Sequence, residues 1–224
     1  MPLIIVLVEC GIELIPKHIR KHSAIQKNLS SRIYATQLLD NALHHSAMIN
    51  LQNSEKRGRP DITHLCLLNA LGSPLNKSGN LKIYLHTVNN KIFEFNSNIR
   101  IARNFNRFKG LIAKLLIDGS IEVGSSKLIA SFNGGLKELI NKFKNKEIYL
   151  FSINGKIINN YKDLFSNDLT KNYIAIIGGF QKGNFSKEII ALSENLISIS
   201  QYSLDAWVVV NKIINYYELT YNIL

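Results

Sequence analysis

Apolar segments typical of buried strands alternate along this chain with segments of helical periodicity, and this alternation constrains the fold more than any other feature. Residues 3–8, 147–152 and 173–177 are rich in Ile, Leu and Tyr, as expected for strands covered on both faces. Strands separated by helices favour a largely parallel α/β sheet, in which ligands bind beyond the C-terminal ends of the strands.

The same patterns give a full set of predicted elements. Strands are predicted at 3–8, 82–87, 91–95, 147–152, 173–177 and 195–198. Helices are predicted at 23–29, 42–51, 60–71, 104–118, 134–142, 187–192 and 203–221. Asn89-Asn90 joins two of the strands, which predicts a hairpin there. With 224 residues and 46% hydrophobic content, the chain is expected to form one domain, residues 1–224.

The charge balance favours a polyanionic partner. Lys and Arg number 27 against 16 Asp and Glu, a formal net charge of +11. Arginine, whose planar fork suits phosphate, is concentrated between positions 57 and 107, while lysine is spread along the chain. These arginines are Arg57, Arg59, Arg100, Arg103 and Arg107. The alternative is a generically basic protein with no nucleic-acid partner.

Cysteine usage and hydropathy bear on the compartment. Cys10 and Cys66 form no CxxC pair and are expected to be packed thiols. No apolar stretch is long enough to span a bilayer, so the sequence predicts a soluble protein of a reducing compartment with no membrane partner.

One short segment, residues 56–64 (KRGRPDITH), concentrates charged groups at the start of a predicted helix. Pro60 suits a helix start, and Asp61 can accept bonds from the free N–H groups of the first turn. A carboxylate held beside Arg57 and Arg59 should stay ionised, and it could accept a proton or orient a weakly acidic N–H. The alternative is a capping residue in a solvated basic turn.

Three predicted strands end in small or turn-forming residues, at 152–155, 178–183 and 198–202. Three such turns at one sheet edge could wrap a flat adenosine with backbone groups. Neither a GxGxxG motif nor a P-loop is present, which disfavours the nucleotide sites that those motifs build.

Arg100, Arg103 and Arg107 share one side of a predicted helix start, interleaved with Phe105 and Phe108. This pattern suits RNA binding, although a solvated helix face over core phenylalanines would look the same. The histidines His44, His45 and His64 lack further ligands at metal spacing, so no metal site is expected.

Several separated motifs together resemble one known family, the ribosome-biogenesis pseudouridine-N1-methyltransferases of the knotted SPOUT class. The motifs lie at 57–64, 67–71, 73–77, 84–87, 103–111, 177–180 and 198–200, with Leu204 and Trp207. The resemblance covers nearly the whole chain. It implies a SPOUT-type α/β trefoil-knot fold with a largely parallel sheet, and an RNA-binding strand and helix insertion at about 73–130.

The resemblance also implies a reaction, the transfer of a methyl group from S-adenosyl-L-methionine to N1 of a pseudouridine in small-subunit ribosomal RNA. Asp61 and Arg59 are then the expected catalytic residues, and Arg57, Arg59, Arg100, Arg103 and Arg107 the expected RNA contacts. The residues expected at the cofactor are Ser152, Gly155, Ile177, Gly178, Gly179, Gly183, Ser198, Ile199, Ser200 and Leu204. Gln181, Lys182 and Asn184 depart from the proline, histidine and aspartate of the family pattern. A non-catalytic assembly factor that binds ribosomal RNA with the same fold is the alternative.

The last helix and the cell compartment complete the expectations. The helix carries a wide apolar stripe: Leu204, Trp207, Val208, Val210, Ile213, Ile214, Tyr217, Leu219 and Tyr221. Such a stripe, with the resemblance, predicts a homodimer through this helix; simple packing on its own sheet is the alternative. The resemblance implies action in the cytoplasm, or in the nucleolus if the cell has a nucleus.

Overall fold

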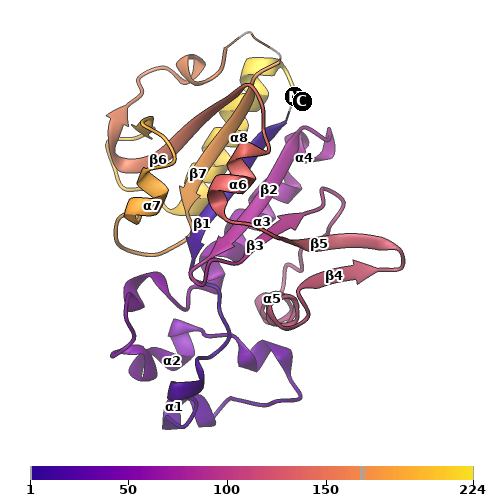
Figure 1. Cartoon of the computed structure of the whole chain (residues 1–224), viewed down its shortest axis with the longest axis vertical. Helices are drawn as coiled ribbons and strands as arrows, with labels where there is room; N and C mark the ends of the chain where they lie inside the picture. The colour runs from indigo at the N-terminus through magenta and orange to yellow at the C-terminus, as the bar shows by residue number, and fades with distance from the viewer. Residues whose placement is uncertain (1, 167, 169, 224) are drawn as a thin grey trace.

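A single mixed sheet organises the molecule. The computed structural model describes residues 2–166, 168 and 170–223. Within these residues eight strands pair in the order β4-β5-β3-β2-β1-β7-β6-β8 (Figure 1). The strands are β1 Leu3–Cys10, β2 Leu81–Thr87, β3 Ile92–Phe95, β4 Ser120–Val123, β5 Ser126–Phe132, β6 Lys146–Ile157, β7 Asn172–Gly178 and β8 Leu196–Ser198. The predicted strands are confirmed to within a few residues, except at the end of β6.

Five strands, β2, β1, β7, β6 and β8, form the parallel half of the sheet. Alternate side chains of β1 enter two different cores, as the period of two requires. Ile5 and Leu7 pack with α3 and α8, whereas Ile4 and Val6 pack with α6 and α7. Helices therefore cover both faces, and the predicted largely parallel α/β class is confirmed for this half.

The helices follow the predicted order, with shorter bounds at several ends. They are α1 Ser23–Gln26, α2 Asn41–Met48, α3 Pro60–Gly72, α4 Pro74–Lys77, α5 Phe105–Asp118, α6 Leu136–Asn141, α7 Lys187–Ile190 and α8 Ala206–Tyr221. Short 3-10 turns add η1 Lys17–Ile19, η2 Tyr34–Gln37, η3 Ser54–Lys56 and η4 Tyr161–Leu164. None of the described helices is long and apolar enough to cross a membrane.

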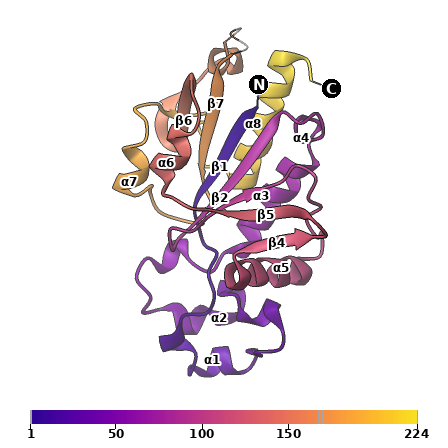
Figure 2. The same ribbon diagram turned by 45° about the vertical axis from the view of Figure 1, so that its right-hand side comes forward.

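An antiparallel arm extends the sheet on the β2 side. β3 pairs with β2 as the predicted hairpin, and β5 and β4 continue the sheet with α5 packed beside them (Figure 2). The hairpin of β4 and β5 was not predicted. Its side chains are mostly exposed, so the apolar alternation that marks a half-buried strand is weak there.

Residues 11–59 form a lobe below the sheet, which the sequence patterns did not separate from the rest (Figure 1). The lobe has its own small core, made by Ile15, Ile25, Leu39, Ala47, Met48 and Leu51. Two ion pairs tie it to the arm and the sheet. Lys109 of α5 reaches Asp40 at 2.9 Å, with both side chains 8% exposed, and Lys56 reaches Glu9 of β1 at 2.8 Å. A third pair, Arg57 with Glu13, lies within the lobe.

β6 runs further than predicted. The expected turn at 152–155 is instead a bulge within the strand, because Phe151 and Lys156 both lie opposite Ile197. A Cβ atom on Gly155 would lie 2.4 Å from the backbone nitrogen of Ile197. The chain can pass this close to β8 only without a side chain at that position.

Candidate functional site

The C-terminal ends of β7, β6 and β8 meet at one edge of the sheet, and their loops enclose a pocket of about 160 Å³. Eight of the ten residues expected at a cofactor line this pocket: Ser152, Ile177, Gly178, Gly183, Ser198, Ile199, Ser200 and Leu204. The remaining walls are apolar or uncharged, and they include Phe151, Phe180, Ile197 and Asn184. No charged side chain lines the pocket among the residues that the structure describes.

The other two expected residues, Gly155 and Gly179, lie outside this lining and have packing roles. Gly155 crosses the backbone of Ile197, as described above. A Cβ atom on Gly179 would lie 2.2 Å from the Sγ atom of buried Cys10. At Gly178, by contrast, a Cβ atom would meet the ring of Phe180 at 2.7 Å, and that ring borders the pocket. Only Gly178 of this glycine pair therefore faces the site.

Arg59 and Asp61 form a bidentate pair at the start of α3. Arg59 donates from Nε and Nη2 to the two carboxylate oxygens of Asp61, at 2.8 and 2.7 Å. Partial burial opposes ionisation of Asp61, but the bonds from Arg59 and from backbone N–H groups outweigh it, so the pKa of this carboxyl lies below its usual 3.8. The carboxylate is 42% exposed. It is thus fixed, ionised and open to a ligand.

The backbone joins this pair to the pocket loops in two steps. The N–H of Arg59 donates to the carbonyl of Gly11 at 3.0 Å, and the N–H of Gly11 donates to the carbonyl of Gly179 at 3.3 Å. A Cβ atom on Gly11 would lie 2.6 Å from the carbonyl oxygen of Lys56. Sequence reasoning missed Gly11, since a lone glycine after a strand gives no signal of a close backbone contact.

Arg57 has a different environment from its neighbour Arg59, although it was expected to contact RNA. Its Nε and Nη2 atoms donate to both oxygens of Glu13 at 2.6 Å, and the Glu13 side chain is only 2% exposed. The ion pair raises the pKa of Arg57. Its guanidinium is therefore held by a buried carboxylate, which favours a structural role, and the expected contact of Arg57 with RNA stays a prediction.

The arginine-bearing segment packs directly on α3. His64 stacks on Phe108 and Phe105, with ring centroids 4.3 and 5.7 Å apart, and its Nε2 lies 2.7 Å from the carbonyl oxygen of Ala102. His64 therefore bridges two of the sequence motifs. The nearby Arg100, Arg103 and Arg107 are exposed. No group of three or more metal-ligating side chains occurs within residues 2–166, 168 and 170–223.

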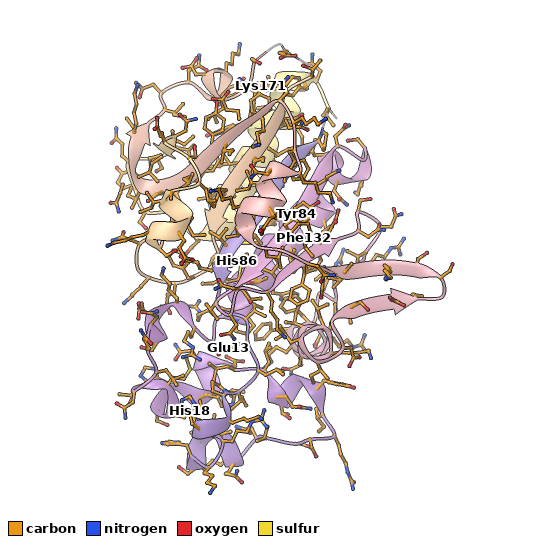
Figure 3. The ribbon with its side chains drawn as sticks, viewed as in Figure 1. Glu13, His18, Tyr84, His86, Phe132 and Lys171 are labelled. Carbon is orange, nitrogen blue, oxygen red and sulfur yellow. The ribbon has the colours of Figure 1, made fainter. Side chains whose placement is uncertain are left out.

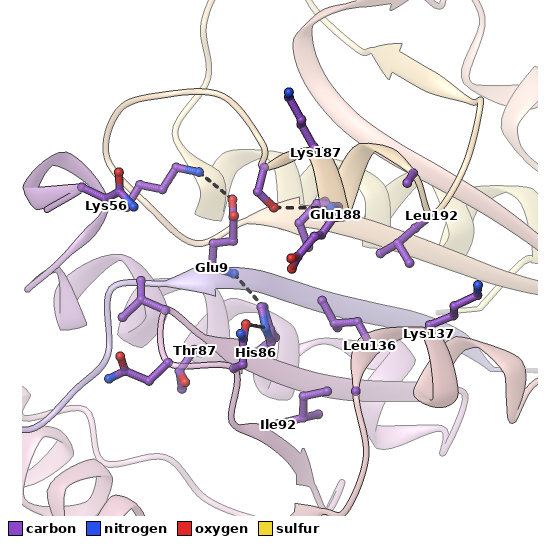
Figure 4. Close-up of a pocket in the computed structure, with 18 of the residues that line it drawn as sticks. Glu9, Lys56, His86, Thr87, Ile92, Leu136, Lys137, Lys187, Glu188 and Leu192 are labelled. Carbon is purple, nitrogen blue, oxygen red and sulfur yellow. Dashed lines mark hydrogen bonds and ion pairs between the residues drawn. The ribbon is translucent and has the colours of Figure 1, made fainter.

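A larger groove of about 1280 Å³ lies on the other side of the 180–186 loop (Figure 4). Glu9, in a left-handed conformation with φ 52°, accepts a bond from Lys56 at 2.8 Å, and its backbone N–H donates to Nδ1 of His86 at 3.1 Å. The Lys56 ammonium also lies 4.6 Å from the ring centroid of Phe180. The sequence patterns did not single out Glu9, Lys56 and His86. Through the contact of Lys56 with Phe180, they support the 180–186 loop on the side that faces away from the cofactor pocket.

The fold and the pocket together define a class of protein. A half-sheet of parallel strands covered on both faces, with an uncharged pocket built from the loops after its last three strands, is the arrangement expected of a SPOUT-type α/β methyltransferase. Comparison with known proteins then identifies the family.

The family model described as "EMG1/NEP1 methyltransferase" matches residues 5–218. The Staphylothermus marinus ribosomal RNA small subunit methyltransferase Nep1 is 39% identical, over 100% of this chain and 98% of its own length. The Thermococcus onnurineus protein of the same name is 37% identical, over 96% and 97%. The crystal structure of Archaeoglobus fulgidus Nep1 bound to S-adenosylhomocysteine has a TM-score of 0.85 at 32% identity, covering 99% of this chain and 100% of that one. The chain belongs to the EMG1/NEP1 methyltransferase family.

Proposed function

We propose that this protein transfers a methyl group from S-adenosyl-L-methionine to N1 of a pseudouridine in small-subunit ribosomal RNA, as a step in the biogenesis of that subunit. The observation that carries the proposal is the uncharged pocket at the ends of β7, β6 and β8, next to the Arg59–Asp61 pair. Similarity to proteins named for methylation of small-subunit ribosomal RNA, and to a structure bound to S-adenosylhomocysteine, supports the substrate and the methyl donor.

The pocket residues fit an adenosine-containing cofactor. Ile177, Ile199 and Leu204 offer apolar walls for a flat base, while the hydroxyls of Ser152 and Ser200 can form hydrogen bonds with a ribose. Gln181 and Asn184, two of the departures from the family pattern, line the pocket, whereas Lys182 is not part of its lining. The departures therefore place no charge beside the cofactor.

Bound in the pocket, S-adenosylmethionine would supply a methyl group on a sulfonium sulfur, a good leaving group, and this methyl would replace the N1 proton of the substrate. Asp61 would accept a hydrogen bond from the N1–H of the substrate and so orient the nitrogen. Because the pKa of Asp61 is lowered, orientation suits this carboxylate better than retention of the proton, which passes to solvent. Arg59 fixes Asp61 and leaves its Nη1 donors for charge on a ring carbonyl.

The remaining exposed arginines extend the site toward RNA. Arg100, Arg103 and Arg107 are proposed, with Arg59, to contact RNA phosphates, since they are exposed at the packed junction of α3 and α5. The target base must be looped out or flipped, because N1 is not accessible inside a stack.

A homodimer through α8 is also proposed, on a narrower surface than the sequence indicated. Ile214 and Tyr217 are each 2% exposed and pack on the sheet of their own subunit, so they are excluded from an interface. Leu219 is 54% exposed and Tyr202 77%, which leaves them available. Light scattering should give about twice the 25.4 kDa chain mass. Leu219→Glu should lower that mass, and an unchanged mass for the variant would place any interface elsewhere.

The direct test of the function is mass spectrometry of small-subunit ribosomal RNA incubated with the protein and S-adenosylmethionine. A gain of one methyl group on a pseudouridine, absent without the protein, is expected. Calorimetric titration with S-adenosylmethionine distinguishes the enzyme from a non-catalytic assembly factor. A protein that binds RNA but not S-adenosylmethionine would be such an assembly factor. We expect the protein to act where small-subunit precursors are assembled, in the cytoplasm or, in a nucleated cell, the nucleolus.

A further inference from the structure

The lobe contains a basic segment without acidic residues, and much of this segment is exposed. Residues 14–39 contain no Asp or Glu, but they include five Lys and Arg residues, namely Lys17, Arg20, Lys21, Lys27 and Arg32. These 26 residues therefore supply +5 of the formal net charge of +11. None of the sites described above uses this charge.

The side chains that carry this charge are held outward on an ordered frame. Lys17, Lys21, Lys27 and Arg32 are exposed, and none of them takes part in an ion pair within the described part of the chain. Arg20 is fixed by its Nε–H, which donates to the carbonyl of Ile15 at 3.1 Å. The lobe core beneath them is closed, because Ile25 and Leu39 are fully buried. The positive charges thus lie in solvent without carboxylate partners.

Two exposed apolar residues lie at one end of this basic segment. Ile33 is 55% exposed and Tyr34 41%, and both follow Arg32 directly. The Lys114 ammonium of α5 lies 5.7 Å from the centroid of the Tyr34 ring. Lys114 is paired with Asp118, whereas Arg32 has no ion-pair partner among the described residues. An accessible aromatic ring next to exposed cations in the sequence suits single-stranded RNA, which needs stacking and phosphate contact.

The lobe surface is continuous with the arginine-bearing helix. η2 of the lobe packs against α5, where a Cβ atom on Gly110 would come within 3.9 Å of the backbone nitrogen of Ala35, and the Lys109–Asp40 ion pair joins α5 to the start of α2 in the same lobe. Arg107 lies in the first turn of α5, and Arg103 precedes it. The lobe therefore prolongs a basic face that already borders the proposed site.

The lobe also lies on the correct side of the sheet. In Figures 1 and 2 the arrowheads of β1 and β7 point toward the lobe, so it projects beyond the same C-terminal edge at which the pocket loops lie. Figure 3 shows Glu13 near the junction with the sheet and His18 further out in the lobe. An RNA strand with its target nucleotide at the pocket could continue across this surface.

We infer that the lobe is a second RNA-contact surface, which binds backbone phosphates of the segment flanking the modified nucleotide. This inference rests on the proposed action on RNA. The surface contributes affinity and placement on a long substrate, and no part of the chemistry. Phosphates, not base edges, are its ligands, because its exposed donors are mostly flexible lysines.

The test replaces Lys17, Lys21 and Lys27 together by Gln, and compares this lobe variant with a control in which Lys142, Lys144 and Lys162 become Gln. All six lysines are exposed, and both variants lose three positive charges. Binding to a long small-subunit RNA fragment is measured across a salt series. The lobe variant should lower the slope of log affinity against log salt by roughly two units, at about 0.7 to 0.9 units per lost phosphate contact, and the control by much less.

A second measurement separates this inference from the proposed function. Methylation of a short stem-loop with the target base, and S-adenosylhomocysteine affinity, should be the same for wild type and lobe variant, while methylation of the long fragment falls at low RNA concentration. Equal salt slopes for lobe variant and control would overturn the inference and leave the enzyme intact. Absence of methylation and RNA binding in the wild type would instead overturn the proposed function.

Discussion

Two arginines separated by one glycine, Arg57 and Arg59, make the same bidentate contact with a carboxylate and yet belong to different parts of the molecule. Arg57 binds Glu13, whose side chain is 2% exposed, while Arg59 binds Asp61, which is 42% exposed. We call the first region the root, defined by Arg57–Glu13, Asp40–Lys109 and the contact of Gly179 with Cys10. The second, the rim, comprises Arg59, Asp61, Gly178 and Phe180.

Root and rim differ in how far water reaches their carboxylates, and not in the types of residue that form them. A buried carboxylate must keep its partner, so Arg57–Glu13 stabilises the lobe itself and Asp40–Lys109 holds the lobe against α5. A carboxylate that water still reaches can exchange water for a ligand, so the rim can act on a substrate. Residue type and spacing alone therefore mark both regions as candidate sites, and burial separates them.

The largest expected effect comes from breaking the root pair. Arg57→Gln leaves the Glu13 carboxylate buried without its partner, and the free energy of unfolding should fall by about 3 kcal/mol or more. Chemical denaturation measures this loss. Combining it with Glu13→Gln should recover much of the stability, because no unpaired charge then remains. If Arg57→Gln kept its stability but bound RNA more weakly, Arg57 would be an RNA contact and would belong to the rim.

The next largest effect is catalytic and belongs to the rim. Asp61→Asn keeps the shape of the side chain but removes the charge that Arg59 fixes. Single-turnover methyl transfer should fall by on the order of 10²-fold, whereas the exposed pair contributes little to stability. Rapid-quench assays with saturating RNA measure the chemical step. Turnover near wild type would remove Asp61 from the mechanism.

Adjacent glycines allow the same comparison at the pocket. Gly179→Ala would drive a Cβ atom into the Cys10 Sγ atom, and it should cost about 1 to 3 kcal/mol of stability. Gly178→Ala meets the Phe180 ring, which can rotate, so the fold should remain while S-adenosylmethionine affinity falls on the order of tenfold, about 1.4 kcal/mol. Calorimetry and thermal unfolding of both variants are needed. If Gly178→Ala instead lost stability and Gly179→Ala instead lost cofactor affinity, Gly179 would face the pocket and Gly178 would have the packing role.

Helix α5 carries Lys109 of the root and the exposed Arg107 on different sides. Arg107→Glu should leave stability within about 0.5 kcal/mol, as for other surface changes. It should also lower the salt slope of RNA binding by about one unit or more, since one phosphate contact is lost. Lys109→Met is the matched variant, and it should reduce stability by leaving Asp40 unpaired. If Arg107→Glu keeps the wild-type salt slope, the exposed side of α5 does not contact RNA phosphates and is only solvated.

The sequence was sufficient for those parts of the site that depend on local pattern. Apolar runs such as 173–177 predicted the strands, and the turns after three strands, together with the family resemblance, predicted eight residues that line the pocket. It could not reveal contacts between distant segments. Glu9 and Lys56 are 47 positions apart, and the contact of Gly179 with Cys10 joins two strands through the fold. The bulge of β6 likewise depends on β8, which follows it by some 40 residues.

The smallest predicted effect is a pH dependence that the root should show and the rim should not. Burial lowers the pKa of His44 below its usual 6.5, and the Nδ1 atom of His44 accepts a bond from the Asp40 N–H at 3.0 Å, which protonation would break. The unfolded chain therefore binds a proton more readily, so stability is full above pH 6.5 and declines as pH falls below it. Asp61, whose pKa is below 3.8, keeps its charge throughout that range.

Denaturation at pH 7.5 and pH 5.5 should show this decline, and His44→Asn, which retains an acceptor for the Asp40 N–H but cannot be protonated, should reduce it. Part of the decline should survive, because burial also lowers the pKa of His86, in which Nδ1 accepts the Glu9 N–H. A decline in His44→Asn as steep as in the wild type would show that His44, which accepts the Asp40 N–H, is not a cause of the pH dependence. Loss of the Asp61 contribution to methyl transfer at pH 5.5, measured as equal rates for wild type and Asp61→Asn on folded protein, would show that Arg59 does not hold the rim carboxylate ionised.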